Sequence, residues 1–122
     1  MTDGEHRDEQ LRVRREHRDG AVVVEVRGEV DGTSVTLVRD ELTAAFREAG
    51  SGPVVIDLTG VGFFASIGMA LLVEHQRLGE VRGTPLRVVA PARSPLRALR
   101  AARLDQVLDL YPDLAAALGA PS

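Results

Sequence analysis

The chain contains three short runs of apolar, mostly β-branched residues, and the segments between these runs carry apolar residues at helical spacing. The runs are Ala21–Arg27, Val54–Leu58 and Leu86–Ala90. Short runs that do not alternate strictly are typical of strands buried on both faces. Strands that alternate with helices need crossover connections, which are right-handed and give a largely parallel sheet. The pattern therefore predicts an α/β domain.

The first helix is predicted between the first two runs and is stopped by Gly50 and Gly52. Thr33 or Ser34 is expected to cap it. The apolar stripe consists of Val35, Val38, Leu42, Ala45 and Phe46. The polar face is assigned to Arg39, Asp40, Glu41, Arg47 and Glu48. This spacing is that of an amphipathic helix with one buried face.

The remaining elements follow the same logic. A loop over Thr59–Ala65 leads into a second helix from about Ser66 to Leu78, which is closed by Gly79. Its front half is apolar nearly all round, so its start is expected to be buried or covered by a partner. A third helix (Ser94 to about Ala102), a last strand (Val107–Tyr111) and a final helix (Leu114–Leu118) complete the chain.

An antiparallel hairpin is expected before these elements, because Leu11 and Val13 alternate with arginines and Asp19-Gly20 is a turn dipeptide. The order becomes ββαβαβαβα, with a mixed, mostly parallel sheet of four or five strands. We expect one domain over residues 11–118, preceded by a mobile polar tail over residues 1–10.

Composition narrows the functional classes. The chain has no cysteine, which removes disulfides and thiolate chemistry. A net charge of -3 gives no basic footprint for nucleic acid. The start is too polar for a signal peptide, and the longest apolar stretch, Val61–Val73, is too short to span a bilayer. We therefore expect a cytoplasmic protein.

No constellation for catalysis is visible. The glycines form no phosphate-binding fingerprint, and Ser66 has no Gly-x-Ser-x-Gly context. His6, His17 and His75 are scattered without a second ligand at metal spacing, so they are expected on the surface. The sequence predicts a protein that is not an enzyme and needs neither metal nor cofactor.

Several segments, taken in order, carry a resemblance to a known family. They are Gly28-Glu29-Val30-Asp31, Val54–Leu58 followed by Val61 and Phe63-Phe64, Ala65-Ser66-Ile67-Gly68, Gly83 with Leu86–Val89 and Arg97, and Leu104–Val107 with Tyr111. Over about residues 11–118 the chain resembles the STAS domain of bacterial anti-sigma-factor antagonists.

The resemblance implies a partner switch. In that family the unphosphorylated domain binds an anti-sigma factor of the serine kinase type and so frees a sigma factor. The kinase then inactivates the domain by phosphorylating a hydroxyl residue at the start of a helix. The resemblance is also compatible with a second function, in which the chain is a STAS subunit of a stressosome or of a lipid-import ABC transporter complex. It is compatible with a homodimer as well.

The implied partner-binding residues are Asp31, Ala65, Ser66, Ile67, Gly68 and Met69. The family's acidic position is Ala65 here, and its phosphoacceptor position is Ile67, which has no hydroxyl. Three interpretations follow: constitutive binding with Ile67 adding apolar contact, phosphorylation of Ser66 instead, or Ser66 as a simple N-cap. Asp31 is as readily an Asx turn or helix cap as a partner contact.

Overall fold

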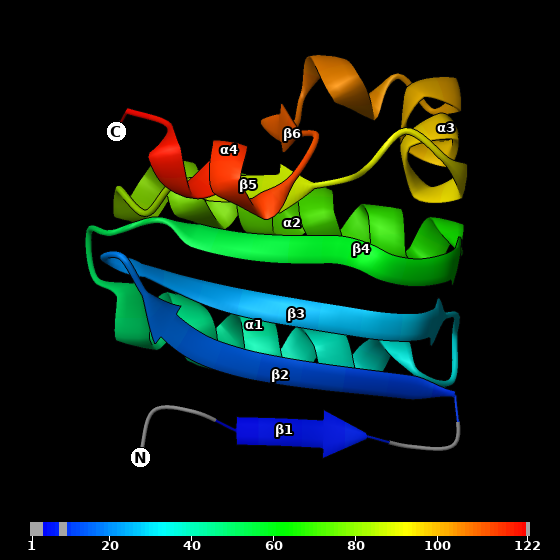
Figure 1. The fold of residues 1–122 in the computed structure, drawn as a ribbon, viewed down its shortest axis with the longest axis horizontal. Helices are drawn as coiled ribbons and strands as arrows, with labels where there is room; N and C mark the ends of the chain where they lie inside the picture. The colour runs from blue at the N-terminus through cyan, green and yellow to red at the C-terminus, as the bar shows by residue number, and fades with distance from the viewer. Residues whose placement is uncertain (1–3, 8–9, 122) are drawn as a thin grey trace.

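The fold is an α/β domain built on one mixed sheet (Figure 1), seen in a computed structural model that describes residues 4–7 and 10–121. Within these residues the sheet has six strands in sequence order. The strands are β1 (Gly4–Arg7), β2 (Leu11–Arg18), β3 (Ala21–Val30), β4 (Val54–Phe64), β5 (Leu86–Val89) and β6 (Leu110–Tyr111). The helices are α1 (Val35–Ala49), α2 (Ser66–Arg82), α3 (Ser94–Ala101), the 3-10 turn η1 (Leu104–Gln106) and α4 (Leu114–Gly119). β1, β2 and β3 pair antiparallel, and β3 to β6 pair parallel, so the predicted fold class is confirmed.

The sheet is covered on both faces, which explains why its central strands do not alternate strictly. α1 and α2 lie behind the sheet in Figure 1 and α4 lies in front of it. Val22, Val24 and Val26 of β3 belong to the large core under α1 and α2. Ala21 and Val23 belong to a smaller core under α4. Because both faces of β3 are buried at this end, apolar residues occupy consecutive positions.

The β2–β3 hairpin turns at Asp19-Gly20, as the dipeptide predicts. Asp19 has a φ of 51° and Gly20 a φ of 79°. Two consecutive positive φ angles are those of a type I′ turn, whose twist matches that of paired strands. The turn fixes the register, in which Arg18 pairs with Ala21.

β2 is tied to α1 by a partly buried ionic network. Arg15 donates to Glu41 and to Glu48, with its Nε 3.1 Å from Oε2 of Glu48. His17 Nε2 lies 2.9 Å from the other oxygen of Glu48. Glu41 is only 1% exposed, so its assignment to the polar face of the first helix is wrong. Its carboxylate instead meets an arginine that points inward from the sheet.

Two boundaries differ from the sequence prediction because glycines lie inside elements. β4 continues through the segment expected as a loop and ends at Phe64. Gly60, inside this strand, lies under the Arg27 side chain. α2 continues past Gly79 to Arg82. A Cβ on Gly79 would lie 2.2 Å from the Thr84 carbonyl oxygen, so this glycine serves close packing. Gly83, with a φ of 72°, ends the helix.

The two ends of the chain also differ from expectation. Gly4–Arg7 pairs with β2, so the prediction of a tail is wrong for these four residues, while residues 1–3 and 8–9 lie outside the described ones. The free edge of β2 offers backbone groups that a polar segment can pair with. The predicted strand over Val107–Tyr111 shrinks to β6, because the N–H groups of Val107 and Leu108 donate to the Leu104 carbonyl of η1 and so hold these residues in a turn. None of the described helices is both long and apolar enough to cross a bilayer.

Candidate functional site

Parallel pairing of β3 with β4 brings two segments that are far apart in sequence to one edge of the sheet. Val30 and Phe64 are the last residues in register, and the Ala65 N–H donates to the Val30 carbonyl at 2.9 Å. The loop after β3 and the start of α2 therefore lie side by side at the carboxyl ends of the strands (Figure 1). The structure thus brings the predicted Asp31 and Ser66 regions together.

The loop after β3 is closed by hydrogen bonds to Asp31. Its Oδ1 accepts from the Thr33 N–H at 2.9 Å, the Thr33 hydroxyl at 2.8 Å and the Ser34 N–H at 3.2 Å. The Ser34 hydroxyl donates to the Glu29 carbonyl at 2.9 Å, which ties the loop back to β3. Asp31 therefore forms the Asx turn that precedes α1. Ser34 is the N-cap residue of α1, as predicted, but its side chain makes no capping hydrogen bond to the helix.

These hydrogen bonds shift the titration of Asp31. The hydrogen bond from Gln10, followed by those from the Thr33 hydroxyl and N–H, lowers the pKa of Asp31 from 3.8 to about 2. Hydrogen bonds to the ionised form stabilise it. The ionised carboxylate therefore stabilises the fold above pH 3.8, and this contribution is lost as the pH falls through about 2.

We expect an NMR titration of the Asp31 carboxyl carbon to show a midpoint near pH 2. In Thr33→Val the hydroxyl donor is removed while the backbone N–H remains, so the midpoint should rise toward 3.8. A wild-type midpoint near 3.8, or no change in the variant, would contradict the closed loop.

The start of α2 presents accessible side chains. Ala65 has extended backbone geometry and is the N-cap, whereas Ser66 is the first helical residue and makes no cap, so the N-cap interpretation of Ser66 is wrong. Ser66 is exposed, and Ile67 retains 45% of its accessible surface. Isoleucine exposed at the beginning of a helix leaves its apolar surface without cover from the described residues.

An exposed aromatic residue, which the sequence interpretation did not assign to the site, adjoins this helix start. Phe63, at the end of β4, is 53% exposed, whereas the next residue, Phe64, is buried under α2. Successive side chains of a strand point to opposite faces, so only one of the two can enter the core. The double phenylalanine was a signal that one ring faces outward.

Two predicted contact residues lie deeper. Gly68 is buried, and a Cβ there would lie 2.9 Å from the Phe64 ring and 3.1 Å from Val30. Its role is close packing of α2 on the sheet, so it does not belong to the accessible surface. Met69 is half-buried and packs against the large core. The accessible side chains at the end of β4 and the start of α2 are those of Phe63, Ser66 and Ile67.

His17 and His75, the two histidines whose side chains the structure describes, are not arranged as a metal site. His75 was expected at the surface but is buried, with Nδ1 2.9 Å from the Leu71 carbonyl and its ring 5.5 Å from that of Phe46. His17 pairs with Glu48, and the His6 side chain lies outside the described ones. Among the described residues no group of three or more metal-ligating side chains gathers.

Comparison with known proteins agrees with this architecture. The family model described as Mlab, STAS domain matches residues 13–112. An anti-anti-sigma factor of Mycobacterium tuberculosis is 32% identical over 89% of this chain and 74% of its own length. The anti-sigma-F factor antagonist RsfA of the same species is 30% identical over 86% of this chain and 83% of its own length.

A solved structure extends the likeness to three dimensions. The crystal structure of an anti-sigma factor antagonist from Mycobacterium paratuberculosis is 30% identical, superimposes with a TM-score of 0.81 and covers 92% of this chain and 94% of that one. The family model and these relatives span both the Asp31 loop and the start of α2. The chain therefore belongs to the STAS-domain family of anti-sigma-factor antagonists.

Proposed function

We propose that this protein is an anti-sigma-factor antagonist that acts by binding and not by catalysis. It docks the surface formed by Phe63, Ser66, Ile67 and the Asp31 loop onto an anti-sigma factor of the serine kinase type, which then releases a sigma factor. The names of the relatives support the general role. The observation that carries the proposal is the pair of exposed large apolar side chains, Phe63 and Ile67, where α2 begins.

The physical case rests on the composition of this surface. Exposed aromatic and aliphatic residues beside polar ones are typical of the centre of a protein interface. The Asp31 loop beside them is held by five hydrogen bonds of Asp31 and Ser34 shorter than 3.3 Å, so it loses little conformational entropy on binding. A preorganised loop next to an apolar patch favours a tight and specific complex.

We further propose that binding is constitutive. Ile67 stands at the family's phosphoacceptor position and offers no hydroxyl. An isoleucine adds apolar area that association can bury. Ser66 is exposed and is the remaining hydroxyl at this helix start. Its phosphorylation is the competing interpretation, because a phosphate at a helix N-terminus is electrostatically favourable.

Ile67→Asp should weaken binding to the anti-sigma factor by about thirtyfold or more, the effect of losing one interface hot spot. The substitution places an unpaired carboxylate in an apolar contact, which is costly to desolvate. The matched control is Val81→Asp on the same helix, because Val81 is 86% exposed. The two positions are about 20 Å apart along the axis. Calorimetry with the purified partner measures both variants.

Two results would overturn the proposal. Equal weakening by Ile67→Asp and Val81→Asp would place the interface elsewhere. Incubation of the complex with ATP, followed by phosphate-sensitive electrophoresis, tests whether binding is constitutive. A shifted band that disappears in Ser66→Ala would replace constitutive binding by phosphorylation of Ser66.

The alternative assemblies make different predictions. A STAS subunit of a stressosome or of a lipid-import ABC transporter would co-purify with other STAS proteins or with a transporter ATPase. Our proposal instead expects a cytoplasmic complex with an anti-sigma kinase. Recovery of the ATPase alone, with no measurable affinity for any anti-sigma kinase of the same cell, would favour the transporter subunit.

A further inference from the structure

The exposed face of α3 carries a row of arginines that the proposed partner surface does not include. α3 buries Pro95 and Leu99, and Leu99 belongs to the large core. Three arginines lie on the other side of the helix at steps of four and three residues, and a fourth follows in the turn after it. All four are exposed: Arg93, Arg97, Arg100 and Arg103. This row forms the basic surface of α3.

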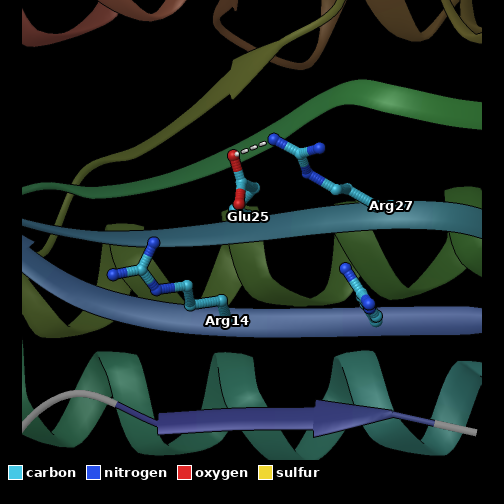
Figure 2. A pocket seen from close by; sticks show the side chains of 4 residues that line it. Arg14, Glu25 and Arg27 are labelled. Carbon is cyan, nitrogen blue, oxygen red and sulfur yellow. Dashed lines mark hydrogen bonds and ion pairs between the residues drawn. The ribbon is translucent and has the colours of Figure 1, made fainter.

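Within the part of the chain that the structure describes, no side chain forms an ion pair or a hydrogen bond with these four guanidiniums. The outer face of the β2–β3 hairpin differs, because Arg27 there is joined to Glu25 at 3.3 Å (Figure 2). The segment from Pro91 to Gln106 contains four arginines and one aspartate, a net charge of +3. The chain as a whole has a net charge of -3, so the rest of it carries -6. Positive charge is therefore concentrated around α3.

Arg103 adopts a backbone conformation that an arginine rarely takes. It follows the C-cap of α3 with a φ of 60° and a ψ of 24°, and its N–H donates to the Arg100 carbonyl at 2.9 Å. Glycine is the usual residue at this position, because a Cβ is strained in left-handed backbone. Among the described residues, Asp19 is the only other non-glycine with a positive φ, and a short polar side chain tolerates it. The exposed guanidinium therefore explains Arg103 better than the turn does.

The basic surface of α3 lies at the end of the sheet where the proposed partner surface is formed. β5 pairs with β4 only as far as Val89 opposite Asp57, and α3 packs against β4. The second half of β4 carries Phe63 and leads directly into α2. Figure 1 shows α3 at the end of the sheet toward which β4 points. A partner bound to Phe63 and Ile67 is therefore positioned to meet the arginines of α3 at the rim of its contact.

We propose that the basic surface of α3 contacts an acidic surface of the anti-sigma factor and speeds the encounter of the two proteins. This inference rests on the proposed function. Arginine is enriched in protein interfaces, and its planar fork of N–H donors matches carboxylate oxygens. Charges at the rim of an interface act mainly on the association rate. The negative charge of the rest of the chain repels nucleic acid, so an acidic protein surface fits these arginines better than a phosphate backbone.

The test is the association rate with the anti-sigma kinase, measured by surface plasmon resonance. Arg97→Gln/Arg100→Gln should lower this rate about tenfold at low ionic strength and leave the dissociation rate nearly unchanged. The difference should disappear at about 1 M salt, where the Debye length is about 3 Å. The matched control, Arg47→Gln/Arg82→Gln, removes two exposed charges in the last turns of α1 and α2 and should associate nearly as fast as the wild type.

Arg103→Gly separates recognition from folding. Glycine adopts the backbone conformation of this turn without strain, so the melting temperature should not fall. Association should nevertheless slow, because one guanidinium of the basic surface is removed. A lower melting temperature with an unchanged association rate would mean that Arg103 serves the turn, and would remove it from the basic surface. Circular dichroism verifies that each variant folds.

Four outcomes would overturn the contact, and they are distinguishable. Equal slowing by Arg97→Gln/Arg100→Gln and by the control would report net charge alone. A wild-type rate in Arg97→Gln/Arg100→Gln, with binding still weakened by Ile67→Asp, would leave the proposed function intact without this contact. A wild type that binds no anti-sigma kinase would end the proposed function and this contact together. Binding of duplex DNA that is lost in Arg97→Gln/Arg100→Gln would assign the arginines to nucleic acid.

Discussion

Arg15→Ala is expected to lower the free energy of unfolding by about 3–5 kcal/mol. The Glu41 side chain is 2% exposed and pairs with Arg15, whose own side chain is 14% exposed. Removing the guanidinium takes from the buried Glu41 carboxylate the positive charge that Arg15 supplies, and loss of one partner of a buried ion pair is costly. Glu48 retains His17 at 2.9 Å, so the main loss falls on Glu41. Chemical denaturation monitored by circular dichroism measures the change.

The neighbouring arginine provides the control. Arg14 precedes Arg15 on β2 but points to the outer face, with its side chain 53% exposed. Arg14→Ala should change stability by no more than about 0.5 kcal/mol. The double variant Arg15→Met/Glu41→Leu should recover most of the lost stability, because apolar residues of similar size can replace a buried ion pair. Equal effects of Arg14→Ala and Arg15→Ala would show that the ionic network contributes nothing.

The burial of Glu41 was predictable in principle from helical spacing. It lies three residues after Val38 and four before Ala45, both of which belong to the buried stripe. The sequence interpretation assigned Glu41 to the polar face because its side chain is charged. The inward-pointing arginine that compensates it comes from β2, 26 residues earlier, and no local pattern reveals that pairing.

Fold class and element order followed from the sequence because hydrophobic periodicity is a local property. The boundaries that were wrong depend on contacts between distant segments. Gly79 was predicted to end the second helix, but it lies within α2. A glycine stands at this position because the Thr84 carbonyl approaches too closely for a side chain. β1 has no apolar pattern of its own and exists through backbone pairing with β2.

The candidate site shows the same division. Asp31 and Ile67 were located through family resemblance, and the parallel register of Val30 with Phe64 explains why they are neighbours. Exposure cannot be assigned from the residue type: Ile67 remains exposed, while Gly68 next to it is buried. Phe63 was missed because β4 was expected to end at Leu58, which left no basis for deciding the direction of its side chain.

The close approach of β2 to β3 makes Gly28 the residue on which the position of the Asp31 loop depends. Gly28 has a φ of 114°, and a Cβ there would lie 2.0 Å from the Gln10 carbonyl oxygen. That same oxygen accepts a hydrogen bond from the Glu29 N–H at 3.0 Å. Gln10 also donates to Asp31 and is the largest cause of its lowered pKa. The segment before β2 is thereby held against the loop that starts α1.

Gly28→Ala should therefore cost about 3 kcal/mol or more of folding stability, combining backbone strain with overpacking against fixed backbone atoms. It should also move the titration midpoint of Asp31 upward from about 2, because the displaced β2 carries Gln10 away from the carboxylate. The matched control is Gly32→Ala in the same loop, where a Cβ meets nothing within 4 Å. Gly32→Ala should stay within about 0.5 kcal/mol of wild type and keep the low midpoint. If Gly28→Ala behaved like Gly32→Ala in both measurements, the strands would not approach as closely as described, and the Asp31 loop would owe its geometry to its own turn alone.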